Sequence, residues 1–269
     1  MANPALLLSG IGMALVGIVA IAYWKFKFRV SINYFLWGAA AWVIAIAIKM
    51  VMDYTITPFL NVWLQSFGIV AALVGMGIYV GLRTGILESG TSYIIMIKTR
   101  LRKMDFKKGV AFGIGFGAAE AIFLGVTSFL NILVFVMFPD IIGIVPEPMR
   151  EVLLTQLNAS SWIVIAPVIE RISITFIHIF SALLVLYALK SRKLSYLVYS
   201  ILFKTFVDGI IPWLAYNMQP LYEVVNAYMI QIPFIILAII SYFGIKWLKP
   251  KLGGDAGERI MGKVMGIIK

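Results

Sequence analysis

The chain has 269 residues, of which 62% are hydrophobic and only 13% are charged, and its formal net charge is +11. Soluble domains typically carry about 25% charged residues, so this composition excludes a soluble enzyme and a disordered chain. The sequence contains no cysteine, which also excludes disulfides, thiolate nucleophiles and cysteine-bound metals. The sequence therefore predicts a protein embedded in a membrane.

Seven apolar segments are long enough to cross a bilayer, which requires roughly 20 apolar residues per helix. They predict an all-α, multi-pass membrane protein with one seven-helix domain at 1–249 and a cytoplasmic amphipathic tail at 250–269. Within that tail, apolar residues recur at helical spacing over 256–269, which predicts a helix lying on the inner leaflet. The predicted spans are about 4–24, 31–52, 62–82, 109–137, 162–189, 194–216 and 223–245.

Basic residues lie almost entirely on one side of these spans. Of the 23 Lys and Arg residues, 19 fall in one set of alternate loops and the C-terminal tail, whereas Arg150 alone falls in the opposite loops. Because cytoplasmic loops are enriched in Lys and Arg, we expect the N-terminus outside and the C-terminus in the cytoplasm. The positive charge then faces anionic headgroups, so we expect membrane lipids rather than nucleic acid as partners, and the cell membrane as the location.

The stretch 83–98 has two alternative structures. It is apolar but too short to cross the bilayer, and basic residues flank it on both sides. It either extends the third helix toward the cytoplasm or forms a re-entrant segment. Gly77, Gly81 and Gly85 recur at four-residue spacing, which would allow another helix to approach closely.

Four polar residues are predicted to lie at a similar depth in the membrane. At 1.5 Å per residue they come to roughly 15–21 Å from the cytoplasmic helix ends, and they are Glu120, His178, Lys204 and Asp208. Ionisable residues inside spans are costly and commonly functional, so we expect a binding cluster. Lys204 and Asp208 are four residues apart, however, and could instead neutralise each other as a structural pair.

The remaining ionisable residues of the spans have a simpler interpretation. Lys49, Glu170 and Arg171 lie further from the middle, where pairing or snorkelling accounts for them. His178 taken alone is more commonly a hydrogen-bonded interior residue than a metal ligand.

The segment 113–121 reads Gly-Ile-Gly-Phe-Gly-Ala-Ala-Glu-Ala. It resembles the fourth-helix motif of the YhfC family, intramembrane metallopeptidases grouped with the CAAX-processing and bacteriocin-immunity proteases. The segments 168–181 and 202–208 resemble the next two motifs, and 87–93 falls where the family carries paired glutamates followed by an arginine. The resemblance covers about 30–215 and implies a protease-like helical membrane fold.

The chain departs from the family pattern at the positions that would form a metal site. Ser89 replaces the second glutamate and Ser92 replaces the arginine. Phe116 and Lys204 stand where the family usually has histidine.

If the enzyme is active, the resemblance implies that Glu88 and Glu120 are catalytic and that His178 and Asp208 hold zinc. A catalytic zinc usually takes three protein ligands, and Lys204 would place a cation among them. We therefore expect that the protease-like scaffold persists, that the metal site is degenerate and that no cofactor is bound.

Three functions from different classes follow from these observations. The favoured one is a non-catalytic protein that binds a partner helix or lipid through a polar groove. The residues of that groove would be Glu120, His178, Lys204 and Asp208. The first alternative is an active intramembrane metalloprotease with an atypical zinc site. The second is a proton-coupled transporter that uses the buried carboxylates as a relay, although the sequence shows no inverted repeat.

Overall fold

The structure is a computed structural model, and it describes residues 2–253. The helix predicted at 256–269 lies outside the described residues. Within the described part every regular element is a helix, and the order along the chain is η1 (Pro4–Leu6), α1 (Leu7–Phe28), α2 (Ile32–Thr55), α3 (Thr57–Gln65), α4 (Ile69–Lys98), η2 (Arg100–Lys103), α5 (Phe106–Met137), η3 (Pro139–Ile144), α6 (Glu147–Leu157), η4 (Ser161–Ile165), α7 (Ala166–Ser191), α8 (Ser195–Gly209), α9 (Ile211–Asn217), α10 (Val224–Met229) and α11 (Ile232–Leu252).

Seven of the described segments are long and apolar enough to cross a membrane, which confirms the predicted number of spans. The fold class is likewise confirmed as all-α within residues 2–253. The spans are Pro4–Phe28, Ile32–Thr55, Ile69–Lys98, Phe106–Met137, Ser161–Ser191, Ser195–Asn217 and Val224–Leu252.

The third span differs from the prediction. Its helix begins at Ile69 rather than near residue 62, because a separate helix, α3, ends at Gln65 and the chain then turns at Gly68 with φ of 98°. α4 continues without a break to Lys98. The stretch 83–98 is therefore an extension of the third spanning helix and not a re-entrant segment.

Proline marks where two other predicted spans are divided. α8 ends at Gly209, and Pro212 lies in the first turn of α9. Pro233 lies in the first turn of α11, directly after α10. Proline has no backbone N–H, so it is tolerated in a first turn but interrupts a continuous helix.

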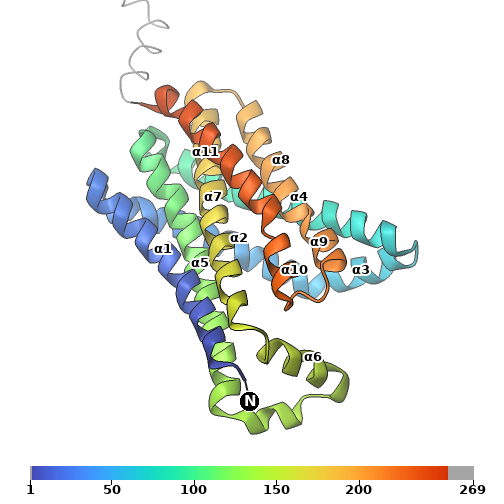
Figure 1. Cartoon of the computed structure of the whole chain (residues 1–269). Coiled ribbons are helices and arrows are strands. Elements are labelled where there is room, and N and C mark those ends of the chain that lie inside the picture. The colour runs from blue at the N-terminus through green and yellow to red at the C-terminus, as the bar shows by residue number, and fades with distance from the viewer. Residues whose placement is uncertain (1, 254–269) are drawn as a thin grey trace, which may run out of the picture.

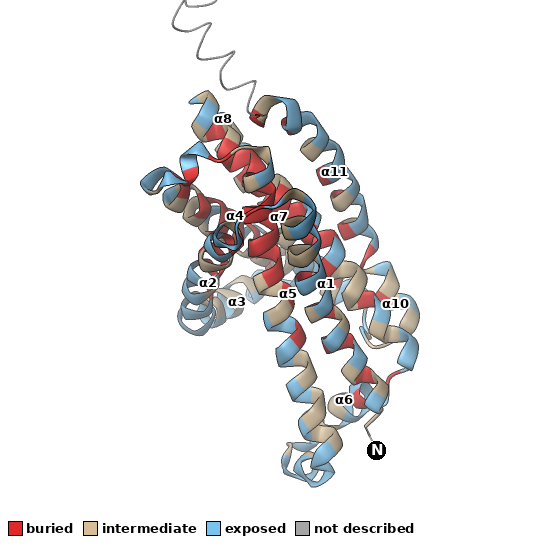
Figure 2. Ribbon diagram, turned by 90° about the vertical axis from the view of Figure 1, so that its left-hand side faces the viewer, coloured by how far each residue is buried: buried red, intermediate tan, exposed pale blue. Residues whose placement is uncertain are grey.

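Two helices form the centre of the bundle. α5 packs against α1, α2 and α7, while α7 packs against α5, α8 and α11 (Figure 1). In the span that contains α7, 72% of an apolar stretch of 18 residues is buried. The corresponding share is 33% or less in each of the other six spans. Buried residues concentrate around α4, α5 and α7 (Figure 2).

Glycines allow α4 to pack closely against α8, as their four-residue spacing predicted. A Cβ atom at Gly81 would overlap the backbone carbonyl oxygen of Thr205, and one at Gly85 would overlap that of Ile201. Contact at this distance brings the polar residues of α4 next to those of α8.

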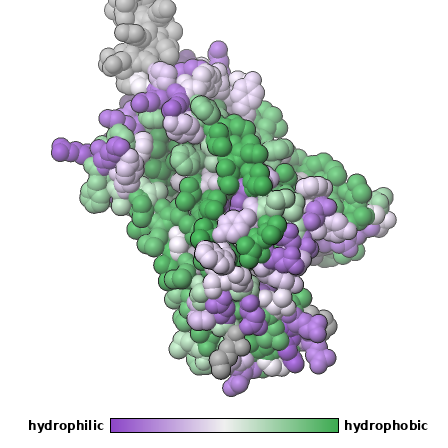
Figure 3. Space-filling model, in the orientation of Figure 1, coloured by the Kyte–Doolittle hydropathy of each residue, from purple (hydrophilic) through white to green (hydrophobic). Residues whose placement is uncertain are grey.

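The basic ends of the helices gather at one end of the molecule. Trp24 at the end of α1 donates a hydrogen bond to the carbonyl of Lys107 at the start of α5 (2.9 Å), and the Lys251 ammonium lies 5.6 Å from the ring centre of Tyr187. Hydrophobic side chains cover much of the middle of the molecule, and hydrophilic ones gather toward its two ends (Figure 3). This distribution suits a multi-pass membrane protein, as predicted.

Candidate functional site

A pocket of about 180 Å³ lies among α2, α4, α5, α7, α8, α9 and α11, and ionisable side chains line it. We call this set the polar cluster. Its members are Lys49, Glu88, Glu120, Glu170, Arg171, His178, Lys204 and Asp208. The four residues predicted from depth therefore line one pocket, together with four more.

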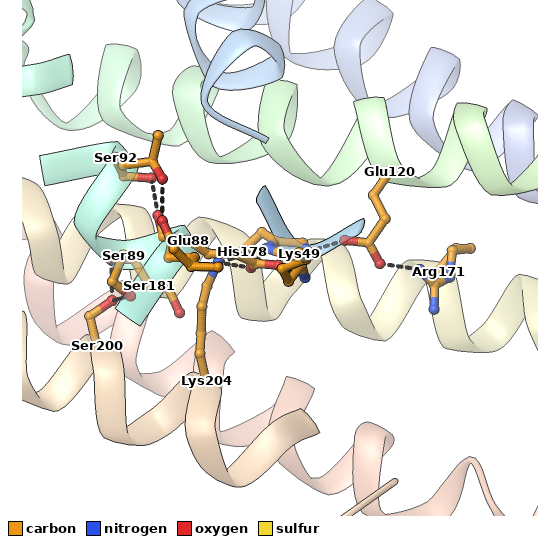
Figure 4. Close-up of polar contacts among 12 residues, drawn as sticks. Lys49, Glu88, Ser89, Ser92, Glu120, Arg171, His178, Ser181, Ser200 and Lys204 are labelled. Carbon is orange, nitrogen blue, oxygen red and sulfur yellow. Dashed lines mark hydrogen bonds and ion pairs between the residues drawn. The ribbon is translucent and has the colours of Figure 1, made fainter. Parts of the chain in front are cut away.

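Glu88 is the acceptor that joins two lysines. It lies on α4 and is only 3% exposed. Its Oε1 accepts a hydrogen bond from Lys49 Nζ at 2.6 Å, and its Oε2 accepts one from Lys204 Nζ at 2.6 Å (Figure 4). One carboxylate thus holds α2 and α8 against α4.

His178 is bound on both sides of its ring. Its Nε2 lies 3.0 Å from Glu120 Oε2, and its Nδ1 lies 3.1 Å from Lys204 Nζ. An ammonium only donates, so Nδ1 accepts from Lys204, and Nε2 then carries the proton that it donates to Glu120. This network assigns His178 as a neutral imidazole with one fixed tautomer.

The Lys204 ammonium also lies over an aromatic ring. Its nitrogen is 4.2 Å from the ring centre of Phe116, whose ring lies 4.8 Å from that of His178. A cation over the face of an aromatic ring is attracted by the ring quadrupole. Phe116 and Lys204 therefore contact each other.

Arg171 neutralises the other end of the cluster. Its guanidinium forms ion pairs with both Glu120 and Glu170, so Glu120 links Arg171 to His178 (Figure 4). Glu120 thus has the cationic partner that the sequence did not identify.

The predicted Lys204–Asp208 pair is wrong. Lys204 instead contacts Glu88 and His178, which α4 and α7 bring to its ammonium. Asp208 lines the same pocket, and no ion pair to it is found among residues 2–253. Four-residue spacing places two side chains on one face of a helix, but it does not decide which neighbour each contacts.

Sequence reasoning undervalued four members of the cluster. Lys49, Glu170 and Arg171 were interpreted as peripheral residues explained by pairing or snorkelling; the pairing is found, but all three residues also line the pocket. Glu88 was assigned a role only in an active enzyme. The predicted third span ended at residue 82, which placed Glu88 beyond the membrane. Lys49 and Arg171 are 8% and 7% exposed, so their charges required buried acidic partners, and that requirement was the available signal.

The residues of the pocket do not fit a catalytic zinc. Such a site needs about three ligands, with neutral histidine and unprotonated carboxylate. Both nitrogens of His178 are already engaged, one by Glu120 and the other by the Lys204 ammonium. Both oxygens of Glu88 are engaged by lysine ammonium groups, those of Lys49 and Lys204. Within the described part of the chain, no group of three His, Cys, Asp or Glu residues is arranged to hold a metal ion.

Comparison with known proteins gives a consistent assignment. The sequence model of a family described as "YhfC intramembrane metalloprotease" matches residues 12–232. The chain is also similar to "Uncharacterized membrane protein YhfC" of Bacillus subtilis (strain 168), with 34% identity over 134 residues. That alignment covers 47% of this chain and 52% of the relative, so the chain spans about half the length of the curated protein that it matches. No solved structure matches the chain.

Proposed function

This chain belongs to the YhfC intramembrane metalloprotease family, and on that premise we propose that it is a non-catalytic member whose polar pocket binds a partner helix or lipid. It is an integral membrane protein, and the proposal concerns what its pocket does. No cofactor is required for this function.

The position of the Lys204 ammonium supports the proposal. It lies between Glu88 Oε2 and His178 Nδ1, at 2.6 Å and 3.1 Å. A carboxylate oxygen and an imidazole nitrogen are both atom types that bind zinc in proteins. A fixed ammonium supplies positive charge to the same atoms, but it has no open coordination position and cannot activate a water molecule as zinc does.

The other contacts of the polar cluster also favour a structural and binding role. A general base must be within hydrogen-bond reach of a proton that it can remove. Glu88 is occupied by two lysines, and Glu120 by Arg171 and His178. Carboxylates held in this way stabilise the arrangement of helices and shape the pocket.

Metal content and peptide cleavage test the proposal. The parent, Lys204→His and Lys204→Met would be purified, and their zinc measured by mass spectrometry. We expect the parent and Lys204→Met to lack stoichiometric zinc. Lys204→His should gain zinc affinity, because it replaces the competing ammonium with a third potential ligand near Glu88 and His178.

A different result would support the active metalloprotease. The parent would then carry one zinc per chain and cleave a labelled transmembrane peptide. His178→Ala would lose that zinc, and Glu120→Gln would lose the cleavage. This set of results would overturn the non-catalytic assignment.

A further inference from the structure

The polar cluster contains one more acidic residue than it has lysines and arginines. Its acidic members are Glu88, Glu120, Glu170 and Asp208, and its cationic members are Lys49, Arg171 and Lys204. Each of the first three acidic residues forms an ion pair with a lysine or arginine of the cluster. Asp208 forms none with any described residue, so the pocket carries an excess negative charge when its carboxylates are ionised and His178 is neutral.

A second polar group without a partner lies in the same pocket. Thr84 is 3% exposed, one turn before Glu88 on α4. Its hydroxyl is buried and has no hydrogen-bond partner among the described residues, and Thr84 lines the pocket together with Asp208. A buried hydroxyl without a partner costs free energy, so it calls for a ligand that the pocket can receive.

The pocket has room for such a ligand and reaches the lipid-facing surface. Its volume of about 180 Å³ is far larger than one water molecule requires. Three of its lining residues are well exposed, Phe123 at 47%, Leu124 at 38% and Ile211 at 40%. Asp208 and Thr84 line the same pocket as these exposed apolar residues.

We propose that Asp208 and Thr84 form a subsite for a primary ammonium group, supplied by a lysine of a partner transmembrane helix. The ammonium has three donors, of which the Asp208 carboxylate and the Thr84 hydroxyl oxygen accept two. This inference rests on the proposed function, because it specifies the chemistry of the helix that the pocket binds.

Depth favours a helix over a lipid as the source of the amine. Asp208 is 13 residues beyond the start of α8 at Ser195, roughly 20 Å along the helix. The hydrocarbon core is roughly 30 Å thick, so Asp208 lies inside it, whereas the amine of a lipid headgroup lies at its surface. A lysine within a spanning helix is costly unless it is paired, and Asp208 provides the pairing charge.

The test uses two synthetic transmembrane peptides of about 20 residues, built from leucine and alanine. One carries a central lysine and the other a central norleucine, which has a similar side-chain length without the charge. Binding to the full-length protein in nanodiscs would be measured by fluorescence energy transfer. We expect the lysine peptide to bind the parent at least about tenfold more tightly, as a charge-assisted hydrogen bond provides.

Variants then locate the subsite. Asp208→Asn should abolish the preference for lysine, and Thr84→Val should reduce it. Asp140→Asn is the matched control, because it makes the same chemical change at an exposed position outside the pocket and should keep the preference. Asp208→Asn should melt at or above the temperature of the parent, since it removes a carboxylate without a cation. A clearly lower melting temperature would show that Asp208 has a structural partner and would overturn the proposal.

The remaining outcomes are also decisive. Equal binding of both peptides, or a preference that survives Asp208→Asn, would overturn the ammonium subsite while leaving helix binding by the pocket intact. Failure of the lysine peptide to bind would overturn the proposed partner. Displacement of the peptide by phosphatidylethanolamine but not phosphatidylcholine, in an Asp208-dependent manner, would assign the amine to a lipid instead. None of these results depends on zinc content or cleavage, which test the proposed function separately.

Discussion

Lys204 on α8 and Glu88 on α4 form a buried ion pair across 116 residues of sequence, with Nζ and Oε2 2.6 Å apart. Glu88 also binds Lys49, so it is shared by two cations. Removal of the carboxylate and removal of one ammonium should therefore have unequal effects. Glu88→Leu leaves two buried ammonium groups without their acidic partner, which costs about 3–5 kcal/mol or more when one member of a buried pair is lost in soluble proteins.

Lys204→Met should cost less, about 1–3 kcal/mol, because Glu88 keeps Lys49 and loses one hydrogen-bond donor. Asp208→Leu should change the melting temperature by the same amount in the Lys204→Met background as in the parent, since Asp208 is not the partner of Lys204. Thermal unfolding of Glu88→Leu, Lys204→Met, Asp208→Leu and the double variant in detergent measures the order of their stabilities. If Lys204→Met were more harmful than Glu88→Leu, or if Asp208→Leu raised stability more in the Lys204→Met background than in the parent, the network around Glu88 would be incorrectly assigned.

The orientation of the chain in the membrane can be tested directly because the sequence contains no cysteine. Single cysteines would be introduced as Asp140→Cys and Arg102→Cys, both at exposed positions. The excess of Lys and Arg in the loops around residue 102 predicts that this end is cytoplasmic. An impermeant maleimide added to intact cells should label the cysteine at position 140, and the one at 102 only after the cells are opened. The reverse pattern would invert the predicted topology.

The sequence predicted the helical bundle well and the contacts of the site less well. Length and apolar composition are local properties, so the number of spans followed from them directly. Depth along a helix is also local, which is why Glu120, His178, Lys204 and Asp208 were expected at one level, and the four residues line one pocket. Which of them touch each other depends on how each helix is rotated, and no single sequence specifies that rotation.

Glu88 is a site residue whose role the sequence alone did not reveal. Its role could not be derived while the third span was placed at 62–82, because the apolar residues of α3 and α4 read as one hydrophobic stretch. The chain turns at Gly68 and α4 continues to Lys98, so Glu88 lies within the candidate span Ile69–Lys98. The α8–α4 pairing then follows from the glycines of α4, since side chains at those positions would hold Lys204 away from Glu88.

The first turn of α5 should respond to acid through Asp105. This residue caps the helix, accepting a hydrogen bond from the backbone N–H of Lys108 at 3.0 Å. Partial burial, the largest single influence, raises the pKa of the Asp105 carboxyl, but the hydrogen bonds and charge of Lys108 outweigh it and hold that pKa below its usual value. A carboxyl with a depressed pKa in the folded state stabilises the protein above its unfolded pKa of about 3.9, and this contribution is lost as the pH falls through the folded value.

Two substitutions separate the effect of the capping hydrogen bond of Asp105 from the effect of its charge. Asp105→Ala should cost about 1 kcal/mol at neutral pH, the usual effect of removing a helix cap. Asp105→Asn keeps a capping oxygen but does not titrate, so its melting temperature should fall less steeply than that of the parent below about pH 4. Melting temperatures between pH 3 and pH 7 provide the measurement. Identical pH profiles for the parent and Asp105→Asn would mean that this carboxyl contributes no titrating stability.

The contact between α2 and α5 should depend on glycine at two positions. A Cβ atom at Gly38 would overlap the carbonyl oxygen of Phe112, and one at Gly115 would overlap that of Phe35. Both obstacles are backbone atoms, which can move only if the helices separate. Gly38→Ala and Gly115→Ala should each destabilise the protein by about 1–3 kcal/mol or more, the range of overpacked cores.

Gly90 on α4 is the matched control, because a Cβ atom there meets nothing within 4 Å. Gly90→Ala should be neutral or stabilise the helix by up to about 1 kcal/mol, since alanine is the better helix former. Thermal unfolding in one detergent compares the three variants with the parent. Similar melting temperatures for all three would show that α2 and α5 do not approach each other as closely as these glycines allow.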